Sequence, residues 1–355
     1  MLKFLLRRLL AILVTLLIVT LVLYGMAMQT PVDQRAMLYY PRTGRLNERQ
    51  MQLLNNQIIQ RYGLDKPFLI QYGGWILGLI QGNWGYSPTV HGPAFPVFLA
   101  RTPATIELLL YSMLLFIPFG IISGLLAAGR RGQIVDVLFR LAAFIGATLP
   151  PFILAIALLA IFYVGLHWFP LGRLSDTGSR LVGSSDFHTF TGLLTLDGLL
   201  NGRLDLSIDA LRHLVLPVIT LSLFHWATLG RITRAVTIEE LDKDYILAAR
   251  GRGASERIVL WRHALRNVLV PALNSSALSA ASLVTGLFII ETLFIYPGAS
   301  SLYVQSIKRS GGALDISITL GFALYCVLAV LILMTVLDVL QMVVDPRLRS
   351  NGNSL

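Results

Sequence analysis

The sequence predicts an all-α membrane protein with six transmembrane helices, on the basis of its composition and the length of its apolar segments. Of its 355 residues, 55% are apolar and only 14% are charged, whereas about a quarter of the residues in an average soluble domain are charged. Apolar stretches of about 20 residues recur, and a helix of that length spans a hydrocarbon core of about 30 Å. The alternative is a soluble protein with unusually long core helices, which this composition disfavours.

The predicted spans cover about residues 5–28, 104–128, 136–166, 213–236, 268–292 and 314–343. The first span follows Lys3, Arg7 and Arg8 and resembles a secretory signal, with Gly25-Met26-Ala27 as a conceivable cleavage site. Its apolar part, however, is longer than the roughly 7–15 residues of a signal core. We therefore expect an uncleaved membrane anchor.

Basic residues predict which side of the membrane each connection faces. They occur before the first span, after the second (Arg130, Arg131), after the fourth (Arg250, Arg252) and in the tail (Arg347, Arg349). An even number of spans puts these regions on one side, and the positive-inside rule makes that side the cytoplasm. The loop at about 29–103 also contains Arg and Lys, but long loops translocate largely regardless of charge. The net charge of +10 thus indicates cytoplasmic loops and not nucleic-acid binding.

Two spans contain helix-breaking residues. Pro118 lies in the second span and Pro150-Pro151 in the third. Proline removes a backbone donor and clashes with the preceding turn, and neighbouring helices can satisfy the freed carbonyls. These residues are either packing kinks or hinges that line a pathway.

Two connections on the predicted outer side are long. Residues 45–82 favour two amphipathic helices, because Asn47 and Gln50 form a capping-box pattern and Gly63 is placed to end the first helix. The loop at 167–212 carries four basic and five acidic residues, so it shows no strong charge bias. It is either a contact for an outside partner or a surface insertion.

The sequence contains no recognisable motif for binding a nucleotide or a metal ion. It has no Gly-rich phosphate-binding loop with a Lys-Ser/Thr end, and its six histidines show no metal-ligand spacing. Glu107 and His225 lie in or near spans, where an ionisable group is a functional candidate. Glu107 could reach the interface, and His225 either lines a pathway or is a neutral, hydrogen-bonded histidine. Asp338 lies near the end of its span and is expected to snorkel or to pair with an Arg.

One polar connection, DYILAARGRGASERIVLWRHALRNVLVP, runs from Asp244 to Pro271 between two apolar spans. Residues 238–250 favour a helix, and Gly251 and Gly253 interrupt it because Gly tolerates a left-handed backbone. Ser255 can cap a second helix, with Glu256 in its first turn. The pattern predicts a helix–turn–helix that either docks into a soluble partner or is an ordinary solvated loop.

This connection resembles the cytoplasmic EAA loop of ABC-transporter permeases, in particular the dipeptide/oligopeptide branch. Ala248, Ala249 and Gly253 match the general motif, whereas Leu247 replaces its Glu and Arg266 its Pro. The branch shares these departures. The resemblance implies contact with an ATPase through Asp244, Tyr245, Ala248, Ala249, Arg250, Arg252, Gly253, Ser255, Glu256, Arg257 and His263. It centres that contact on residues 250–257.

The resemblance extends over nearly the whole chain. The segments RTPATIELLL, LPPF and LGRITRAV, the run ETLFIYPG that begins at Glu291, and DPRLR near the end are similar to the branch in the same order. The chain departs from the branch at RSGGALD, where an Asp-x-Pro is common, and in the length of the loop at 167–212. The resemblance implies a type I ABC-importer permease fold. The candidate pathway or hinge residues are Pro118, Pro150, Pro151, His225 and Glu291.

The resemblance also implies an organisation and a set of partners. The expected parts are an N-terminal helix (1–30), an extracytoplasmic helical segment (31–103), a core permease domain (104–345, including outer loop 167–212 and coupling loop 238–268) and a cytoplasmic tail (346–355). The expected partners are a second homologous permease, two ABC ATPases, an extracytoplasmic binding protein and membrane lipid. ATP and Mg would bind the ATPases, and this chain itself would bind no cofactor or metal and would not be an enzyme.

The expected function is peptide import across a bacterial or archaeal cytoplasmic membrane. Nickel, glutathione and oligosaccharide remain alternative substrates of the same machine. A self-contained carrier or channel and a non-transporting scaffold remain alternatives of other classes.

Overall fold

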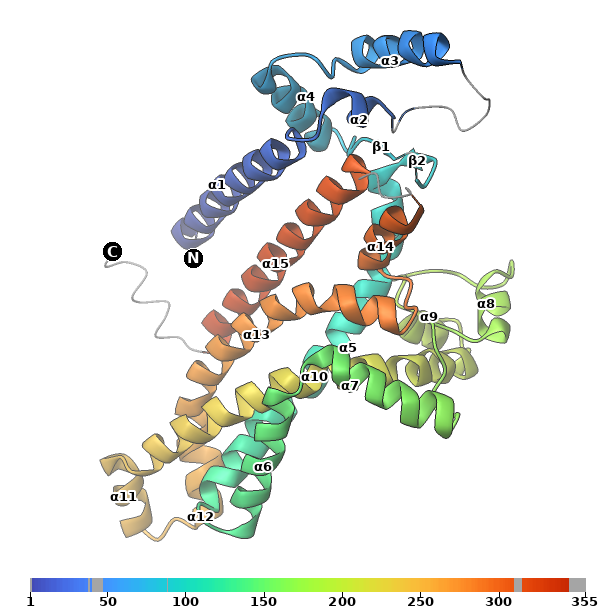
Figure 1. The fold of residues 1–355 in the computed structure, drawn as a ribbon. Helices are drawn as coiled ribbons and strands as arrows, with labels where there is room; N and C mark the ends of the chain where they lie inside the picture. Colours follow the sequence, from blue (N-terminus) through green and yellow to red (C-terminus); the bar gives the residue numbers. More distant parts are fainter. Residues whose placement is uncertain (1, 38, 40–46, 88, 310–314, 345–355) are drawn as a thin grey trace. The chain divides into compact units, whose positions relative to one another are not determined.

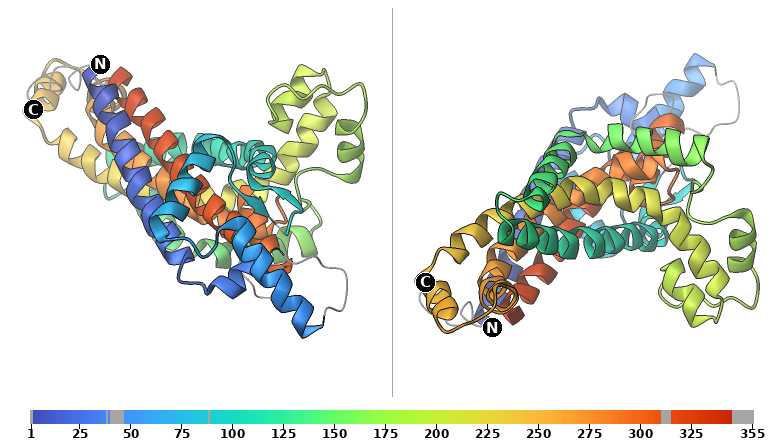
Figure 2. Two further views of the ribbon diagram at one scale, coloured as in Figure 1. Left: turned by 90° about the horizontal axis from the view of Figure 1, so that it is seen from above. Right: turned by 90° about the horizontal axis from the view of Figure 1, so that it is seen from below.

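The computed structural model describes residues 2–37, 39, 47–87, 89–309 and 315–344, and nearly every element in these ranges is a helix (Figures 1 and 2). The predicted all-α fold is therefore confirmed. Five of these helices are long and apolar enough to cross a membrane, and six if one bent pair counts as a single span. The predicted tail (346–355) and the side chains of Lys3, Arg7, Arg8 and Asp338 lie outside the described residues.

The residues group into two compact units. Unit 1 consists of Met1–Thr102 with Gly298–Leu328, and unit 2 consists of Pro103–Pro297 with Ala329–Leu355. Residues 298–328, which the sequence assigns to a core domain with the later spans, thus group with the N-terminal elements. Two long helices, α5 (Ala94–Gly129) and α15 (Ile316–Val344), continue from one unit into the other along the chain.

Unit 1 is built around the first span and the segment that follows it. Besides the first parts of α5 and α15, it contains α1 (Leu2–Ala27), α2 (Val32–Met37), α3 (Glu48–Tyr62), α4 (Phe68–Ile80), the antiparallel strands β1 (Tyr86–Ser87) and β2 (Gly92–Pro93), and α14 (Ala299–Arg309). Its buried core includes Trp84, Phe98 and Leu302.

The two amphipathic helices predicted between residues 45 and 82 are present as α3 and α4. The backbone N–H of Asn47 donates to the Gln50 side chain at 3.1 Å, as the capping-box pattern predicts. At the other end of α3, Gly63 has a φ of 60°, the left-handed conformation that ends a helix. The local sequence signals are therefore sufficient to fix both boundaries of α3.

Unit 2 consists of long helices joined by short ones. It contains most of α5, then α6 (Ile134–Thr148), α7 (Pro151–Leu158), the π-helical η1 (Leu159–Gly165), α8 (Asp176–Val182), α9 (Leu194–Leu200), α10 (Leu204–Leu241), α11 (Asp244–Gly251), α12 (Glu256–Ile258), the π-helical η2 (Val259–Ala264), α13 (Leu265–Leu293) and the end of α15. Helix α10 packs along α13, α6, α7 and α9.

Helices α5 and α10 approach each other closely at a pair of glycines. A Cβ atom on Gly124 would lie 2.5 Å from the carbonyl oxygen of Gly230, so a larger residue does not fit there. One turn away, the indole N–H of Trp226 donates to the Ser123 hydroxyl at 3.0 Å. This contact fixes α5 against the helix that leads into the polar connection.

The two prolines of the third predicted span cause a break and not a simple kink. Helices α6 and α7 meet at 101° (Figure 1). Both Leu149 and Pro150 precede a proline and have extended backbones, with ψ values of 114° and 135°, because a following proline disfavours the helical conformation. Pro151 then starts α7 at a position where its missing N–H has no cost. Pro118 lies inside α5 without interrupting it.

Two helices begin earlier than the sequence predicts. Helix α5 starts at Ala94 and α10 at Leu204, about ten residues before the predicted spans. The helix that contains α13 starts at Glu256, as predicted for the helix that follows Ser255. Pro103 and charged residues such as Asp205 indicate the end of an apolar span in the sequence. The helix nevertheless continues through them, because their polar groups reach water or protein partners.

The loop at 167–212 is an ordered helical insertion held by a buried carboxylate. Glu107 on α5 is fully buried. It accepts hydrogen bonds from the Arg173 guanidinium at 2.7 and 3.1 Å and from the backbone N–H and hydroxyl of Thr195, both at 2.8 Å. The Tyr296 hydroxyl also donates to Glu107, at 3.3 Å. Glu107 therefore has a structural role, because these donors enclose it.

The same cluster includes the start of the segment after α13. Thr105 donates to the Glu291 carboxylate at 2.8 Å, and the backbone N–H of Tyr296 donates to the Glu291 carbonyl at 2.8 Å. Burial raises the pKa of Tyr296, so its hydroxyl keeps the proton that it donates to Glu107. The carboxylate cluster thus joins α5, the inserted loop and the end of α13.

Replacing Glu107 with Gln is expected to destabilise the protein by about 3 kcal/mol, because the largely buried Arg173 guanidinium loses its anionic partner. Thermal unfolding of the purified protein in mild detergent measures this change. The exposed pair Arg203–Asp205 lies in the same insertion and supplies a control, since Asp205→Asn should leave the melting temperature nearly unchanged. Equal effects of the two substitutions would contradict a structural role for Glu107.

Candidate functional site

The polar connection, defined as residues 238–268 and called the polar loop below, folds as the end of α10, then α11, α12, η2 and the start of α13 (Figures 1 and 2). In both figures α11 and α12 lie together beyond the ends of the long helices α10 and α13. The helix–turn–helix predicted from the sequence is therefore present, with two differences in its details.

The first difference is a break between α10 and α11. The sequence predicts one helix over 238–250, but α10 ends at Leu241 and Lys243 has an extended backbone, with a ψ of 149°. The side chain of Lys243 forms an ion pair with Glu240. The break turns α11 away from the axis of α10 and lets its residues contact η2.

Glu240 is the centre of the contacts at this break. Its carboxylate accepts hydrogen bonds from the Tyr245 hydroxyl at 2.5 Å and from the Asn267 amide at 3.3 Å, and Asn267 also donates to Tyr245 at 2.9 Å. Burial and the Glu240 carboxylate raise the pKa of Tyr245, so this hydroxyl stays protonated. We call Glu240, Lys243, Tyr245 and Asn267 the Glu240 cluster; it links α10, α11 and α13.

The second difference concerns the cap of the second helix. Ser255 occupies the N-cap position before Glu256 as predicted, but its side chain makes no capping hydrogen bond. Instead, the Ser255 carbonyl accepts from the Val259 N–H at 2.9 Å. The Glu256 carboxylate pairs across the turn with the Arg250 guanidinium, at 2.8 and 3.2 Å, which holds the two sides of the turn together.

Glycine at position 253 allows the reversal between α11 and α12. Gly253 has a φ of +82°, a conformation that costs other residues about 1 kcal/mol or more. No heavy atom lies within 4 Å of the place where its Cβ would be. Gly253 is therefore required for backbone conformation and not for space.

A small apolar cluster supports the turn from within. Ile246, Val259 and Ala264 are buried together, and Leu241, Tyr245 and Ala254 pack against them. Ala249 is also buried, whereas Ala248 is exposed and its carbonyl accepts from the Arg252 side chain at 3.2 Å. The two alanines of the motif thus have different environments, because only one faces the apolar cluster.

The outer face of the polar loop combines exposed apolar side chains with arginines. Leu247 is 56%, Ile258 46% and Trp261 39% exposed, and Arg252, Arg257 and Arg262 are exposed beside them. A cleft of about 370 Å³ lies next to this face, between the end of α5 and the start of α12, and includes Arg257, Leu260 and Trp261 in its walls. Exposed aromatic, aliphatic and Arg side chains around a cleft are typical of a protein-docking surface.

The base of the loop is braced by a second carboxylate. Asp136 on α6 accepts from Arg234 on α10 at 2.6 and 2.8 Å and from the Gly132 N–H at 3.1 Å. Together with the Glu240 cluster, this ion pair holds the end of α10 against α6 and α13. Sequence reasoning missed Asp136, Glu240 and Asn267. Glu240 follows Glu239 and Asn267 follows Arg266, so the local sequence does not distinguish these residues from solvated polar groups.

The predicted pathway residues do not form one site. His225 is buried with its ring against Phe116 and Phe224, and within the described residues it makes no hydrogen bond. Glu291 contacts Thr105 instead. Positions 105 and 116 are about 16 Å apart along α5, so His225 and Glu291 contact different levels of that helix. His263, predicted for the docking surface, is half-buried in η2.

The part of the chain that the structure describes contains no group of three or more His, Cys, Asp or Glu side chains that could hold a metal ion. The polar loop instead presents an exposed surface of apolar and cationic side chains, held in place by the Glu240 cluster and by Asp136.

Comparison with known proteins places this arrangement in a family. Residues 117–350 match the model of binding-protein-dependent transport system inner membrane components, and residues 1–99 match the N-terminal model of the membrane components of such systems. The chain is 33% identical to the di/tripeptide transport system permease protein DppB of Pseudomonas aeruginosa, over 98% of this chain and 99% of that protein.

Two further relatives show the same full-length similarity. The dipeptide transport system permease protein DppB of Escherichia coli is 32% identical over 98% of this chain and 99% of its own length. The oligopeptide transport system permease protein AppB of Bacillus subtilis is 30% identical over 92% and 95%, respectively. With its membrane helices and its polar loop, the chain belongs to the family of binding-protein-dependent transport system inner membrane components.

Proposed function

We propose that this chain is a permease subunit of an ATP-driven ABC importer that takes up di- or oligopeptides. The full-length similarity to relatives named as di/tripeptide, dipeptide and oligopeptide permeases supports the substrate class. The membrane would be the cytoplasmic membrane of a bacterium or archaeon, with both termini and the polar loop in the cytoplasm, in accordance with the basic residues of those regions.

The observation that carries the proposal is the outer face of the polar loop. Residues 250–257 and the neighbouring Leu247, Ile258 and Trp261 would dock on an ATPase subunit, which binds ATP and Mg. The apolar side chains would enter a groove of the ATPase and the arginines would contact its rim, a division typical of protein interfaces. A second permease, a second ATPase and an extracytoplasmic binding protein would complete the assembly.

Coupling would follow from the way in which the polar loop is attached. The Glu240 cluster links α10, α11 and α13, and Asp136 links α10 to α6. Movement of the docked loop when the ATPases close would therefore move three long helices together. Nucleotide would shift the equilibrium between inward- and outward-open states only if docking contacts differ between those states.

The substitution Gly253→Pro should abolish ATP-dependent uptake, because proline fixes φ near −65° and cannot adopt the +82° of this turn. The control is Gly202→Pro outside the polar loop, since Gly202 also has a positive φ, of 68°, and open space around its Cβ position; this variant should retain uptake. The measurement is peptide uptake by cells that contain equal amounts of assembled transporter. Normal uptake by an assembled Gly253→Pro transporter would contradict the coupling role.

Reversing the charge of both Arg252 and Arg257 to Glu should release the ATPases. Both side chains are exposed, so folding should be preserved while the arginine contacts to the ATPase rim are lost. We expect at least a tenfold loss of ATPase in affinity purification, equivalent to about 1.4 kcal/mol of binding. Arg180→Glu, an exposed residue of α8, is the matched control. Unchanged ATPase recovery with the double variant would rule out this docking face.

The assembly purified in mild detergent from the native membrane should contain a second permease and Walker-type ATPases. In proteoliposomes it should accumulate a labelled dipeptide only when ATP and the binding protein are both present. Transport by the isolated chain without ATP would instead establish a self-contained carrier. ATP-dependent transport of nickel, glutathione or an oligosaccharide, but not of peptides, would support the importer assignment and contradict the peptide substrate.

A further inference from the structure

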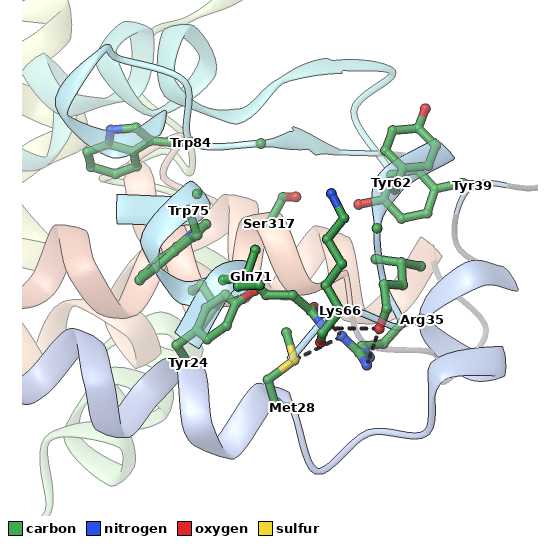
Figure 3. A pocket seen from close by; sticks show the side chains of 16 residues that line it. Tyr24, Met28, Arg35, Tyr39, Tyr62, Lys66, Gln71, Trp75, Trp84 and Ser317 are labelled. Carbon is green, nitrogen blue, oxygen red and sulfur yellow. Dashed lines mark hydrogen bonds between the residues drawn. The ribbon is translucent and has the colours of Figure 1, made fainter. Parts of the chain in front are cut away.

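Unit 1 contains a cavity of about 430 Å³ at the end of the first span (Figure 3). Its walls come from the end of α1, from α2, from the turn between α3 and α4, from α4 and from the start of α15. Residues that matter for its chemistry are Arg35, Tyr39, Lys66, Gln71, Trp75 and Ser317. None of its lining residues belongs to the polar loop.

The cavity contains a buried cation that has no anionic partner in the part of the chain that the structure describes. Arg35 is only 5% exposed. Its guanidinium donates to the carbonyls of Thr30 and Leu64, both at 3.1 Å, and to the Gln71 side-chain oxygen at 3.3 Å; one Nη1–H also points to the Met28 sulfur. All of these acceptors are neutral, and within the described residues Arg35 forms no ion pair.

A buried arginine without a carboxylate is costly, since desolvating the charge is offset only by an opposite charge or strong hydrogen bonds. Arginine has five N–H donors, and the contacts named above use four of them. Among the described residues, one Nη2 hydrogen of Arg35 therefore has no acceptor and is available to a ligand. Both the unbalanced charge and the remaining donor indicate an anionic ligand.

A second cation lines the same cavity. Figure 3 shows the Lys66 side chain extending through the cavity, while the Arg35 guanidinium lies beside Gln71 and Met28. The stem of Lys66 packs over Gly63, where a Cβ would be 3.0 Å from its Cδ and Cε atoms. Within the described residues the Lys66 amine has no acidic partner. Lys66 itself is exposed, so its amine lines the cavity from the solvent-accessible side.

The nearby carboxylates do not neutralise these cations. Asp315 is buried but accepts from the Ser87 hydroxyl at 2.6 Å and from the Thr89 and Ile318 N–H groups at 3.3 and 3.2 Å. Asp33 is exposed and accepts from the Asn55 amide at 2.8 Å. The cavity therefore has a net positive lining with hydroxyl groups from Tyr39 and Ser317 in its walls.

The surroundings of the cavity are those of a membrane interface. Tyr24, near the end of the apolar span Leu10–Ala27, stacks on Trp75 with ring centroids 5.0 Å apart, and such aromatic pairs concentrate at headgroup depth. Helix α4 exposes the apolar side chains Leu69, Leu77 and Ile80 to its surroundings. Cations in a cavity that borders exposed apolar surface match a molecule with both an anionic group and hydrocarbon chains.

We propose that this cavity binds the phosphate group of an anionic phospholipid, with the acyl chains over the exposed apolar side chains of α1 and α4. Arg35 supplies a guanidinium hydrogen bond and Lys66 a point charge to the phosphate. Trp75 and Tyr24 lie beside the glycerol region. The proposal rests on the membrane location of the chain and is independent of the transported substrate.

Native mass spectrometry of the complete transporter, titrated in detergent with phosphatidylglycerol, tests this site. Lys66→Gln should weaken lipid retention about fivefold, the effect of one basic residue near an anionic lipid. Arg49→Gln, an exposed residue of α3, removes the same charge away from the cavity and should have no effect. Arg35→Lys keeps the buried positive charge but loses the planar guanidinium with its several N–H donors. This variant should weaken lipid retention while the assembly stays intact.

Two comparisons identify the source of the phosphate. Phosphatidylcholine should be retained less than phosphatidylglycerol, because it carries no net negative charge. A large molar excess of inorganic phosphate should not displace the lipid, since inorganic phosphate makes no apolar contacts. Displacement by inorganic phosphate would overturn the lipid assignment in favour of a free anion. Equal lipid retention by the Lys66→Gln and Arg49→Gln variants would overturn the site itself.

Discussion

Every peptide group inside a hydrocarbon layer must find its hydrogen-bond partner within the protein, and this constraint determines most of the structure. It accounts for helices that continue through Pro118 and Pro271, where one lost backbone bond is tolerated. It also accounts for the position of the only sharp break within the described spans, at Pro150-Pro151. There the loss of two consecutive N–H donors coincides with two residues that a following proline makes extended.

Two buried carboxylates of unit 2, Glu107 and Glu240, each connect several helices. At one end Glu107 joins α5, the inserted loop and the segment after α13. At the other end Glu240 joins α10, α11 and α13. Helix α13 is thus connected near both ends, to Glu107 through Tyr296 and to Glu240 through Asn267.

Local signals in the sequence predict much of this arrangement. The apolar segments predict the spans, Asn47, Gln50 and Gly63 predict the bounds of α3, and Gly253 predicts the reversal in the polar loop. Partners distant in sequence could not be predicted: Thr195 and Arg173 reach Glu107 from 88 and 66 residues away, and Asn267 reaches Glu240 from 27. Periodicity and capping describe neighbours along one helix and carry no information on which carboxylate a distant donor will meet.

The length of α10 has a consequence for the membrane in which the protein operates. Its 38 residues correspond to about 57 Å at 1.5 Å per residue, whereas the hydrocarbon core is about 30 Å thick. Even at a tilt of about 40° the helix exceeds that thickness by more than 10 Å. Helix α10 is therefore longer than the hydrocarbon core requires. A change of a few Å in bilayer thickness alters which of its residues meet the headgroups, but the helix stays continuous up to the polar loop.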